Sequence, residues 1–376
     1  MIKLRALGFS LAIAAAAAPV SAYEIKAKHS VHEAITRLAL RCAQAGEPGT
    51  PPADCKQDYR QIAVIAAYPR SLLTNFNRLE ASVRWPDDPL RSLYSPGGAI
   101  GFGVKTALGG CEHGDAERGL ETLYGRGLLC GSHYGRLQFL HAMAVDNEQD
   151  QAEITRRKVL DWAMFAYQVA TARAPAGAPY CRYVGENAGA VALELSPKGF
   201  PFCGPTERPS WRVGTLFSLK CWLPTTRAGC TEYLSETRAQ RAAAGAFLHV
   251  IQDSYSQSHT RRSPGASTSD FVPRADCGFP SEFYAYTEVN RAHHSDADKA
   301  PARGDACGSP AAAADVVTAS AEAIWHLCRN SDPGVVRAFL EQRVFGKVGE
   351  EAEQAASPEV HAGRPAPFPK QCGLIP

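Results

Sequence analysis

The sequence lacks several features that would each define a class of protein. Its 12 cysteines include no Cys-x-x-Cys pair, and a zinc–thiolate site usually needs such close pairs. The 40 basic residues nearly balance the 38 acidic ones, which weakly disfavours stable binding of long nucleic acid, because such proteins usually carry a basic surplus. Runs that alternate apolar and polar residues are scarce and no internal repeat is present, so the sequence favours helices over sheets.

The N-terminal segment has the composition of a secretory signal peptide. Lys3 and Arg5 precede an apolar run that ends in small residues at 20–22, which predicts a signal peptide over residues 1–22 and cleavage before Tyr23. The run is shorter than the roughly 20 residues of a spanning helix, and no later segment approaches that length. We therefore expect a secreted or periplasmic protein without a transmembrane anchor, which is formally neutral once Lys3 and Arg5 are removed.

The cysteines favour a disulfide framework. All 12 lie after the predicted cleavage site, and an even number of cysteines in an exported chain is typical of disulfide bonding. We expect pairs between neighbours along the chain, such as Cys42 with Cys55 and Cys221 with Cys230.

Helical patterning predicts an all-α fold, a multi-helix bundle with a disulfide-rich insertion. Residues 30–46 open with Ser30 and Glu33 in capping-box register and end at Gly46, so they predict one helix with His32 in its first turn. Apolar residues that recur three and four positions apart predict further helices at 70–84, 151–173, 234–257, 281–299 and 311–330.

The mature chain is long enough to bury a large core in one domain, which we assign to residues 23–345. This domain contains an insertion at about 174–230 that is rich in Gly, Pro and Cys. Residues 346–376 are polar and proline-rich, which predicts a poorly ordered tail that Cys372 tethers.

Two histidine–aspartate pairs have the spacing of metal ligands. His249 and Asp253 lie on one face of a predicted helix because they are four residues apart, and His259 follows soon after. His294 and Asp298 repeat this spacing in the predicted helix 281–299. Histidine and aspartate are common zinc ligands, so each pair is a candidate half of a metal site.

Other candidate ligands lie upstream of these pairs. Asp87 and Asp88 follow Trp85 and a proline, which stiffens the backbone while the tryptophan supplies an apolar wall. His141 lies in the apolar stretch LQFLHAMAV, where an imidazole needs a partner. His32 opens the first predicted helix.

Each residue has a common structural explanation when it is taken alone. A His-x-x-x-Asp pair on a helix is more often a surface or capping pair, His141 alone would be a hydrogen-bonded core histidine, and Asp87 alone a turn residue. Arg261 and Arg262 are by default solvated cations near a helix C-terminus. Metal ligation is favoured because these residues occur together in one chain. The two histidine–aspartate pairs and the other histidines supply enough donors for more than one ion.

The ordered set of these residues resembles the zinc-dependent bacterial phospholipases C, which share an all-helical trinuclear zinc fold with the fungal single-strand nucleases. The resemblance extends from Tyr23 to about Lys299. Its points appear in family order: His32, the Trp85-Pro86-Asp87 element, His141, the His249, Asp253 and His259 run, and the His294 and Asp298 pair.

The resemblance implies three zinc ions whose ligands come from distant parts of the chain. One ion would be held by Asp87, His141, His249 and Asp253. A second would be held by His259, His294 and Asp298. The third would be held by the amino nitrogen and carbonyl oxygen of Tyr23, by His32 and by Asp253, which bridges two ions.

This chain departs from the family pattern at several points. Tyr23 stands where the family usually has tryptophan, and Gln252 stands where it usually has glycine. His29 is an alternative to His32 as the histidine nearest the N-terminus.

The resemblance implies a zinc metallohydrolase that acts on phosphodiesters. Clustered divalent cations stabilise charge on phosphate oxygens and lower the pKa of water. Asp87 would be the catalytic residue, combining metal ligation with orientation of that water, and Arg261 and Arg262 are candidates for binding a phosphate oxygen. The expected substrate is a phospholipid at a membrane surface or in micelles, cleaved to diacylglycerol and a phosphorylated head group.

Two alternatives use the same residues differently. An extracellular single-strand nuclease or nucleotidase would act on the same zinc core. A disulfide-stapled helical binding protein would keep the scaffold without catalysis, although buried histidines and aspartates without metal are costly to retain.

The ligand role assigned to Tyr23 depends on cleavage, because only cleavage creates its free amine. A chain expressed in the cytoplasm with methionine retained before Tyr23, and then refolded oxidatively, should bind about one zinc fewer than the exported form and lose most activity. Zinc analysis and turnover, with N-termini confirmed by mass spectrometry, measure both effects. Equal zinc content and turnover in the two forms would remove Tyr23 from the ligand set.

Overall fold

The computed structural model describes a defined subset of the chain. These residues are 30–46, 49–52, 55, 60–66, 78–87, 131–133, 135–145, 151–195, 212–217, 235–263, 278–285, 315–346 and 372. Several predicted features lie outside them: the signal peptide, Tyr23, His29, Asp88, the Cys221–Cys230 pair, His294, Asp298 and most of the C-terminal tail.

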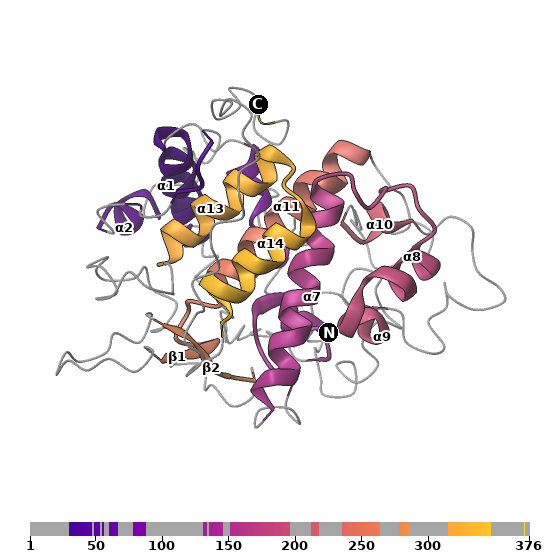
Figure 1. The fold of residues 1–376 in the computed structure, drawn as a ribbon. Helices are drawn as coiled ribbons and strands as arrows, with labels where there is room; N and C mark the ends of the chain where they lie inside the picture. Colours follow the sequence, from indigo (N-terminus) through magenta and orange to yellow (C-terminus); the bar gives the residue numbers. More distant parts are fainter. Residues whose placement is uncertain are drawn as a thin grey trace, which may run out of the picture.

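The described residues are mostly helical, as predicted, and also form a two-stranded sheet (Figure 1). The α-helices are α1 (Val31–Ala45), α2 (Arg60–Ala66), α3 (Arg78–Ser82), α7 (Ala152–Ala170), α8 (Tyr180–Asn187), α9 (Ala192–Leu195), α10 (Val213–Phe217), α11 (Glu236–Asp253), α13 (Val316–Arg329) and α14 (Pro333–Phe339). The 3-10 helices are η3 (Gln138–His141) and η4 (Gly189–Val191), η5 (Leu340–Val344) is a π-helix, and the strands are β1 (Thr260–Ser263) and β2 (Phe279–Phe283).

Helix α11 has neighbours on several sides. It contacts α1, α3, α7, α10 and α13, and in Figure 1 it lies behind α13 and α14, beside α7. Its buried face is rich in small residues, including Ala239, Ala243, Ala244 and Ala246, all fully buried. Because small side chains let helix axes approach closely, α11 can be surrounded without leaving voids.

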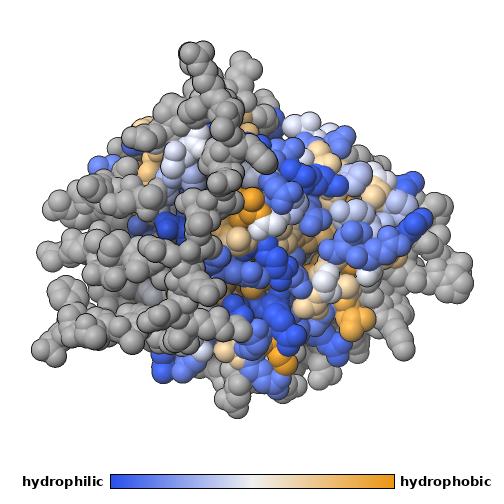
Figure 2. All heavy atoms as spheres, viewed as in Figure 1, coloured by the Kyte–Doolittle hydropathy of each residue, from blue (hydrophilic) through white to orange (hydrophobic). Residues whose placement is uncertain are grey.

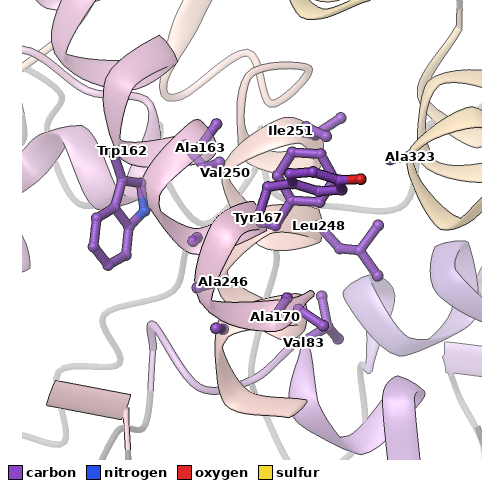
Figure 3. Packing of buried hydrophobic residues seen from close by; sticks show 14 of the residues in the cluster. Val83, Trp162, Ala163, Tyr167, Ala170, Ala246, Leu248, Val250, Ile251 and Ala323 are labelled. Atoms are coloured by element: carbon purple, nitrogen blue, oxygen red, sulfur yellow. The ribbon is translucent and has the colours of Figure 1, made fainter. Parts of the chain in front are cut away.

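Helices α7 and α11 pack against each other, with Tyr167 of α7 beside α11 in Figure 3 and its ring centroid 5.5 Å from that of Phe247. Trp162 and Tyr167 of α7 are fully buried, as are Leu248 and Ile251 of α11. Burial of each such side chain stabilises the fold by about 2 to 3 kcal/mol. This packing fixes the position of α11, and therefore of the polar residues near its C-terminal end.

The sheet pairs β1 with β2 in an antiparallel register. Thr260 lies opposite Phe283 and Arg262 opposite Pro280, with an irregularity between Arg261 and Arg262. The prediction of a helix over 281–299 is therefore wrong at its beginning, because the end of β2 occupies that part. The pairing partner lies about 20 residues earlier in the sequence, so local periodicity could not reveal it. The rest of this predicted helix, residues 286–299, lies outside the described ranges.

The other predicted helices agree with the structure where it describes them. The helices predicted at 151–173 and 311–330 are observed as α7 and α13, and the one predicted at 234–257 ends earlier, as α11. Asp315 caps α13 by accepting hydrogen bonds from the backbone N–H groups of Val317 and Thr318. Of the helix predicted at 70–84, the described part is α3 and the turn that follows it.

The first predicted helix is observed as α1, but its predicted capping box does not form. The side chain of Ser30 makes no capping hydrogen bond, and Glu33 is buried in an ion pair with Arg84 instead. The C-terminal end is as predicted, since the N–H of Gly46 bonds to the carbonyl of Cys42. Tertiary pairing with the turn after α3 therefore replaces local capping at the start of this helix.

Two disulfides agree with predictions from the cysteine pattern. Cys42 is bonded to Cys55, and Cys328 at the end of α13 is bonded to Cys372. The second bond attaches the tail to the helical domain, as expected for Cys372. Disulfides persist in oxidising compartments, which agrees with the expected export.

Hydrophilic residues cover most of the described surface on the face shown in Figure 2, and hydrophobic ones form small patches among them. The exposed large hydrophobic side chains of the described residues are Val64 and Leu193. None of the described helices has both the length and the hydropathy of a membrane span.

Gly245 provides a test of how closely α11 approaches its neighbours. A Cβ at this position would overlap the carbonyl oxygen of Ser82 and lie 2.8 Å from the backbone nitrogen of Val83. Gly245→Ala should therefore lower the free energy of unfolding by about 1 to 3 kcal/mol. Gly185→Ala is the matched control, because it lies within α8 with nothing inside 4 Å; it should stabilise by up to about 1 kcal/mol. Denaturant unfolding measures both, and equal effects would contradict the close approach.

Candidate metal centre

Six side chains from separate segments converge in the interior. They are all at most 3% exposed, and we call them the histidine–aspartate cluster: His32, Asp87, His141, His249, Asp253 and His259. Every residue of the cluster was a candidate ligand in the sequence, and the folded chain brings them together around the carboxylate of Asp253.

Helix α11 supplies the centre of the cluster. His249 and Asp253 lie one turn apart, and the Nε2 atom of His249 is 2.8 Å from Oδ2 of Asp253. The Nδ1 atom of His141, at the end of η3, is 2.9 Å from the same oxygen. The ring of His32 on α1 stacks on that of His249 with centroids 4.1 Å apart, and its Nε2 lies 3.3 Å from the other carboxylate oxygen, Oδ1 of Asp253. The two oxygens of Asp253 therefore face different histidines.

Asp87 approaches the cluster from the turn after α3. Its carboxylate oxygens lie 3.7 Å from Nδ1 of His141 and 3.6 Å from Nε2 of His249. Trp85 packs against Trp162 and Phe217, with ring centroids 6.4 and 5.1 Å away. The apolar wall predicted for Trp85 is confirmed, and it anchors the turn that presents Asp87.

His259 is held between η3 and the sheet. Its Nδ1 atom is 2.7 Å from the carbonyl oxygen of His141, and its own carbonyl accepts a hydrogen bond from the N–H of Tyr284. The same residue, Tyr284, accepts a hydrogen bond at its carbonyl from Ala144. These backbone bonds bring His259 and His141 to the same side of Asp253.

Hydrogen bonds fix the orientation of three imidazoles. A carbonyl oxygen can only accept, so Nδ1 must carry the proton where His249 bonds to Val83 and where His259 bonds to His141, at 2.9 and 2.7 Å. Nδ1 of His32 is 2.8 Å from Oε1 of Gln252 in the same way. Metal-binding histidines usually donate one ring N–H to such an acceptor, which leaves the other nitrogen for the ion.

The pKa values of the central pair favour metal-binding forms. Burial lowers the pKa of His249 to about 3, so its imidazole is neutral. Burial alone would raise the pKa of Asp253, but the neighbouring imidazoles of His249, His259 and His141 hold it well below its usual value. A neutral imidazole and an ionised carboxylate are the forms that coordinate divalent cations.

The arrangement of lone pairs indicates that a cation fits this cluster. With its proton on Nδ1, neutral His249 directs a lone pair at Asp253 Oδ2 from 2.8 Å, and two acceptors at that distance need a proton or a cation between them. The buried ionised carboxylate of Asp253 also needs compensating positive charge. Three overlapping groups of residues each offer donor atoms that lie within 4.8 Å of one another inside the group. They are His32, Asp87 and His249; His141, His249 and Asp253; and Asp87, His133 and His141.

One residue near the cluster was missed by sequence analysis. His133 is 5% exposed, and its ring centroid lies 4.6 Å from that of His141. It lies in the segment CGSHYG, where no second histidine or carboxylate stands at helical spacing. A signal was nevertheless present, because a histidine eight residues before His141 could have been considered as a candidate.

The two candidate substrate-binding arginines lie in different environments. Arg261 is exposed and pairs with Glu282 at 3.0 Å. Arg262 is buried: its guanidinium donates hydrogen bonds to the carbonyl oxygens of Ser254, Gly278 and Val344. The default description of Arg262 as a solvated cation is therefore wrong, because it fixes the end of α11 to neighbouring segments.

Comparisons of this chain with protein-family models, with curated proteins and with solved structures give no significant match. The class that fold and site define is thus a mostly helical, disulfide-bonded protein whose buried histidines and aspartates could bind metal ions.

Gln252 offers a test of how His32 is oriented. Its Oε1 accepts from His32, and its Nε2 donates to the hydroxyl of Thr36 at 2.9 Å. Gln252→Leu should weaken ion binding beside His32 by about 10- to 100-fold, because the ring loses the acceptor that fixes it. Chelator competition measures this affinity.

The matched control is Thr36→Val, which removes the far end of the same network but leaves the bond to His32. It should lower the unfolding free energy by about 1 to 3 kcal/mol while changing ion affinity much less. Equal ion affinities in Gln252→Leu and the wild type would contradict the orienting role.

Proposed function

We propose that this chain is an exported zinc-dependent phosphodiester hydrolase, with a phospholipid as its preferred substrate. The observation that carries the proposal is the convergence of the histidine–aspartate cluster on Asp253. Its six members come from distant parts of the chain, yet they include each described residue of the ligand pattern in the phospholipases C that the sequence resembles. Diacylglycerol and a phosphorylated head group would be the products.

The donor set suits zinc. Imidazole nitrogen and carboxylate oxygen are its common protein ligands besides thiolate, and the cysteines described here, such as Cys42 and Cys328, are in disulfides. Asp87, His141, His249 and Asp253 would hold one ion. His32, Asp253 and the amino end at Tyr23 would hold another, and His259 would hold a third with His294 and Asp298.

The protein's own residues would prepare the site for attack on phosphorus. When bound, the ions supply charge stabilisation for phosphate oxygens and lower the pKa of water. Asp253 would balance the charge of two ions, since its two oxygens contact different histidines. Asp87 would orient the attacking water with the carboxylate oxygen that does not bind an ion. Burial of both carboxylates strengthens these interactions, because few water molecules screen them.

The phospholipid preference rests on the resemblance and on charge. A formally neutral mature chain has no excess charge with which to hold a polyanion such as single-stranded DNA. The disulfides agree with a protein that acts outside the cytoplasm, where it would meet phospholipid in a membrane or in micelles.

The proposal is tested by substrate profiling together with metal analysis. Protein purified without chelator should contain at least one zinc per chain and hydrolyse phosphatidylcholine faster than single-stranded DNA. Asp253→Asn keeps the side-chain shape and removes the charge, so it should lower turnover by at least about 100-fold, in the range seen when one charge-stabilising group is lost.

Each result has a defined meaning. Less than one zinc per chain would leave a helical binding protein and overturn the enzyme proposal. Faster cleavage of single-stranded DNA would assign the nuclease function to the same residues. Wild-type turnover in Asp253→Asn with full zinc content would show that Asp253 does not bridge ions.

A further inference from the structure

His133 lies next to the histidine–aspartate cluster but belongs to none of the ligand sets proposed above. Residues 131–133 are helical, and the side chain of His133 is buried. Its ring is tilted by 50° to that of His141, with centroids 4.6 Å apart. The histidine therefore contacts the proposed metal site from the side of η3.

The position of His133 fits that of a ligand. One potential donor atom from each of Asp87, His133 and His141 lies within 4.8 Å of the others. Zinc bonds to nitrogen and oxygen are about 2.0 to 2.2 Å long, so two ligands of one ion lie about 3 to 4 Å apart. A small rotation of one side chain therefore suffices for all three to reach a common ion.

The hydrogen bond of His133 also fits that role. Its Nδ1 atom is 3.0 Å from the hydroxyl oxygen of the buried Ser132. A hydroxyl can accept from the Nδ1 proton, and Nε2 is then the ring nitrogen whose lone pair can coordinate an ion. In His249 and His259 the Nδ1 atom likewise bonds to a protein oxygen, there a backbone carbonyl.

We infer that His133 is a direct ligand, through Nε2, of the metal ion that Asp87 and His141 hold. The inference rests on the proposed function, because it presumes an ion at Asp87. The ion would then have one more neutral imidazole donor than the resemblance implies, and zinc accommodates five ligands as well as four. The competing explanation is that His133 is a core histidine, which is held by its hydrogen bond to Ser132 and only fills space beside the site.

The two explanations differ in how much ion affinity His133 contributes. Loss of a residue that merely supports a ligand typically weakens metal binding by about 10- to 100-fold. Loss of a direct ligand should exceed that range. His133→Gln should therefore weaken the binding of one zinc ion by more than about 100-fold and leave the other ions bound.

The experiment compares three glutamine variants by zinc content during chelator competition and by the visible spectrum of the Co²⁺-substituted protein. His141→Gln should lose the same ion as His133→Gln. His326→Gln is the negative control, because His326 is equally buried, on α13, and belongs to none of the donor sets found among the described residues. A changed Co²⁺ spectrum in His133→Gln and an unchanged one in His326→Gln would support ligation.

Suppose that the wild type binds zinc. A loss of zinc affinity of less than about 100-fold in His133→Gln, or an unchanged Co²⁺ spectrum of that variant, would then overturn the inference. A wild type with less than one zinc per chain would overturn the proposed function as well, so the two failures are distinguishable. If His133→Gln does not fold, His133→Asp substitutes another zinc ligand. Retained zinc with an altered Co²⁺ spectrum in that variant would support the inference, and an unaltered spectrum would overturn it.

Discussion

The burial of the Asp253 carboxylate is the constraint on which the rest of this structure depends. An ionised group in the interior needs compensating charge and hydrogen bonds, and here imidazoles surround it. His249 comes from the same helix, while His32 and His141 come from segments more than 100 residues away in sequence. The helices that carry them must therefore pack with little freedom, because a displacement would leave a buried charge without partners.

The packing of α11 meets this requirement. Its small residues let α3 approach so closely that the carbonyl of Val83 accepts the hydrogen bond from Nδ1 of His249. At the C-terminal end of α11, Arg262 bonds to the carbonyls of Ser254 and Val344 and lies 3.8 Å from the Tyr255 ring centroid. Hydrogen bonds from side chains to main-chain carbonyls thus hold the backbone around the site, and the bond to Val83 uses only one nitrogen of the His249 ring.

Gln252 shows how a departure from a family pattern can be absorbed. Where the resembled family usually has glycine, this chain has a fully buried amide that joins His32 to Thr36 and also lies 3.4 Å from the Ser320 hydroxyl. The side chain therefore links α1, α11 and α13 beside the cluster. A larger residue at this position is tolerated because its polar atoms are paired and they orient a candidate ligand.

The sequence by itself determined the helical class, the principal helices, the Cys42–Cys55 bond and the residue types of the cluster, because helical periodicity and ligand spacing are local properties. Only the tertiary structure decided what depends on long-range contacts. Glu33 pairs with Arg84 and does not cap its helix. The start of a predicted helix is strand β2, which pairs with β1. His133 lies beside the site although its segment has no second histidine or carboxylate at helical spacing. In each case the deciding partner, which is Arg84, β1 or Asp87, lies beyond the span of a local periodicity pattern.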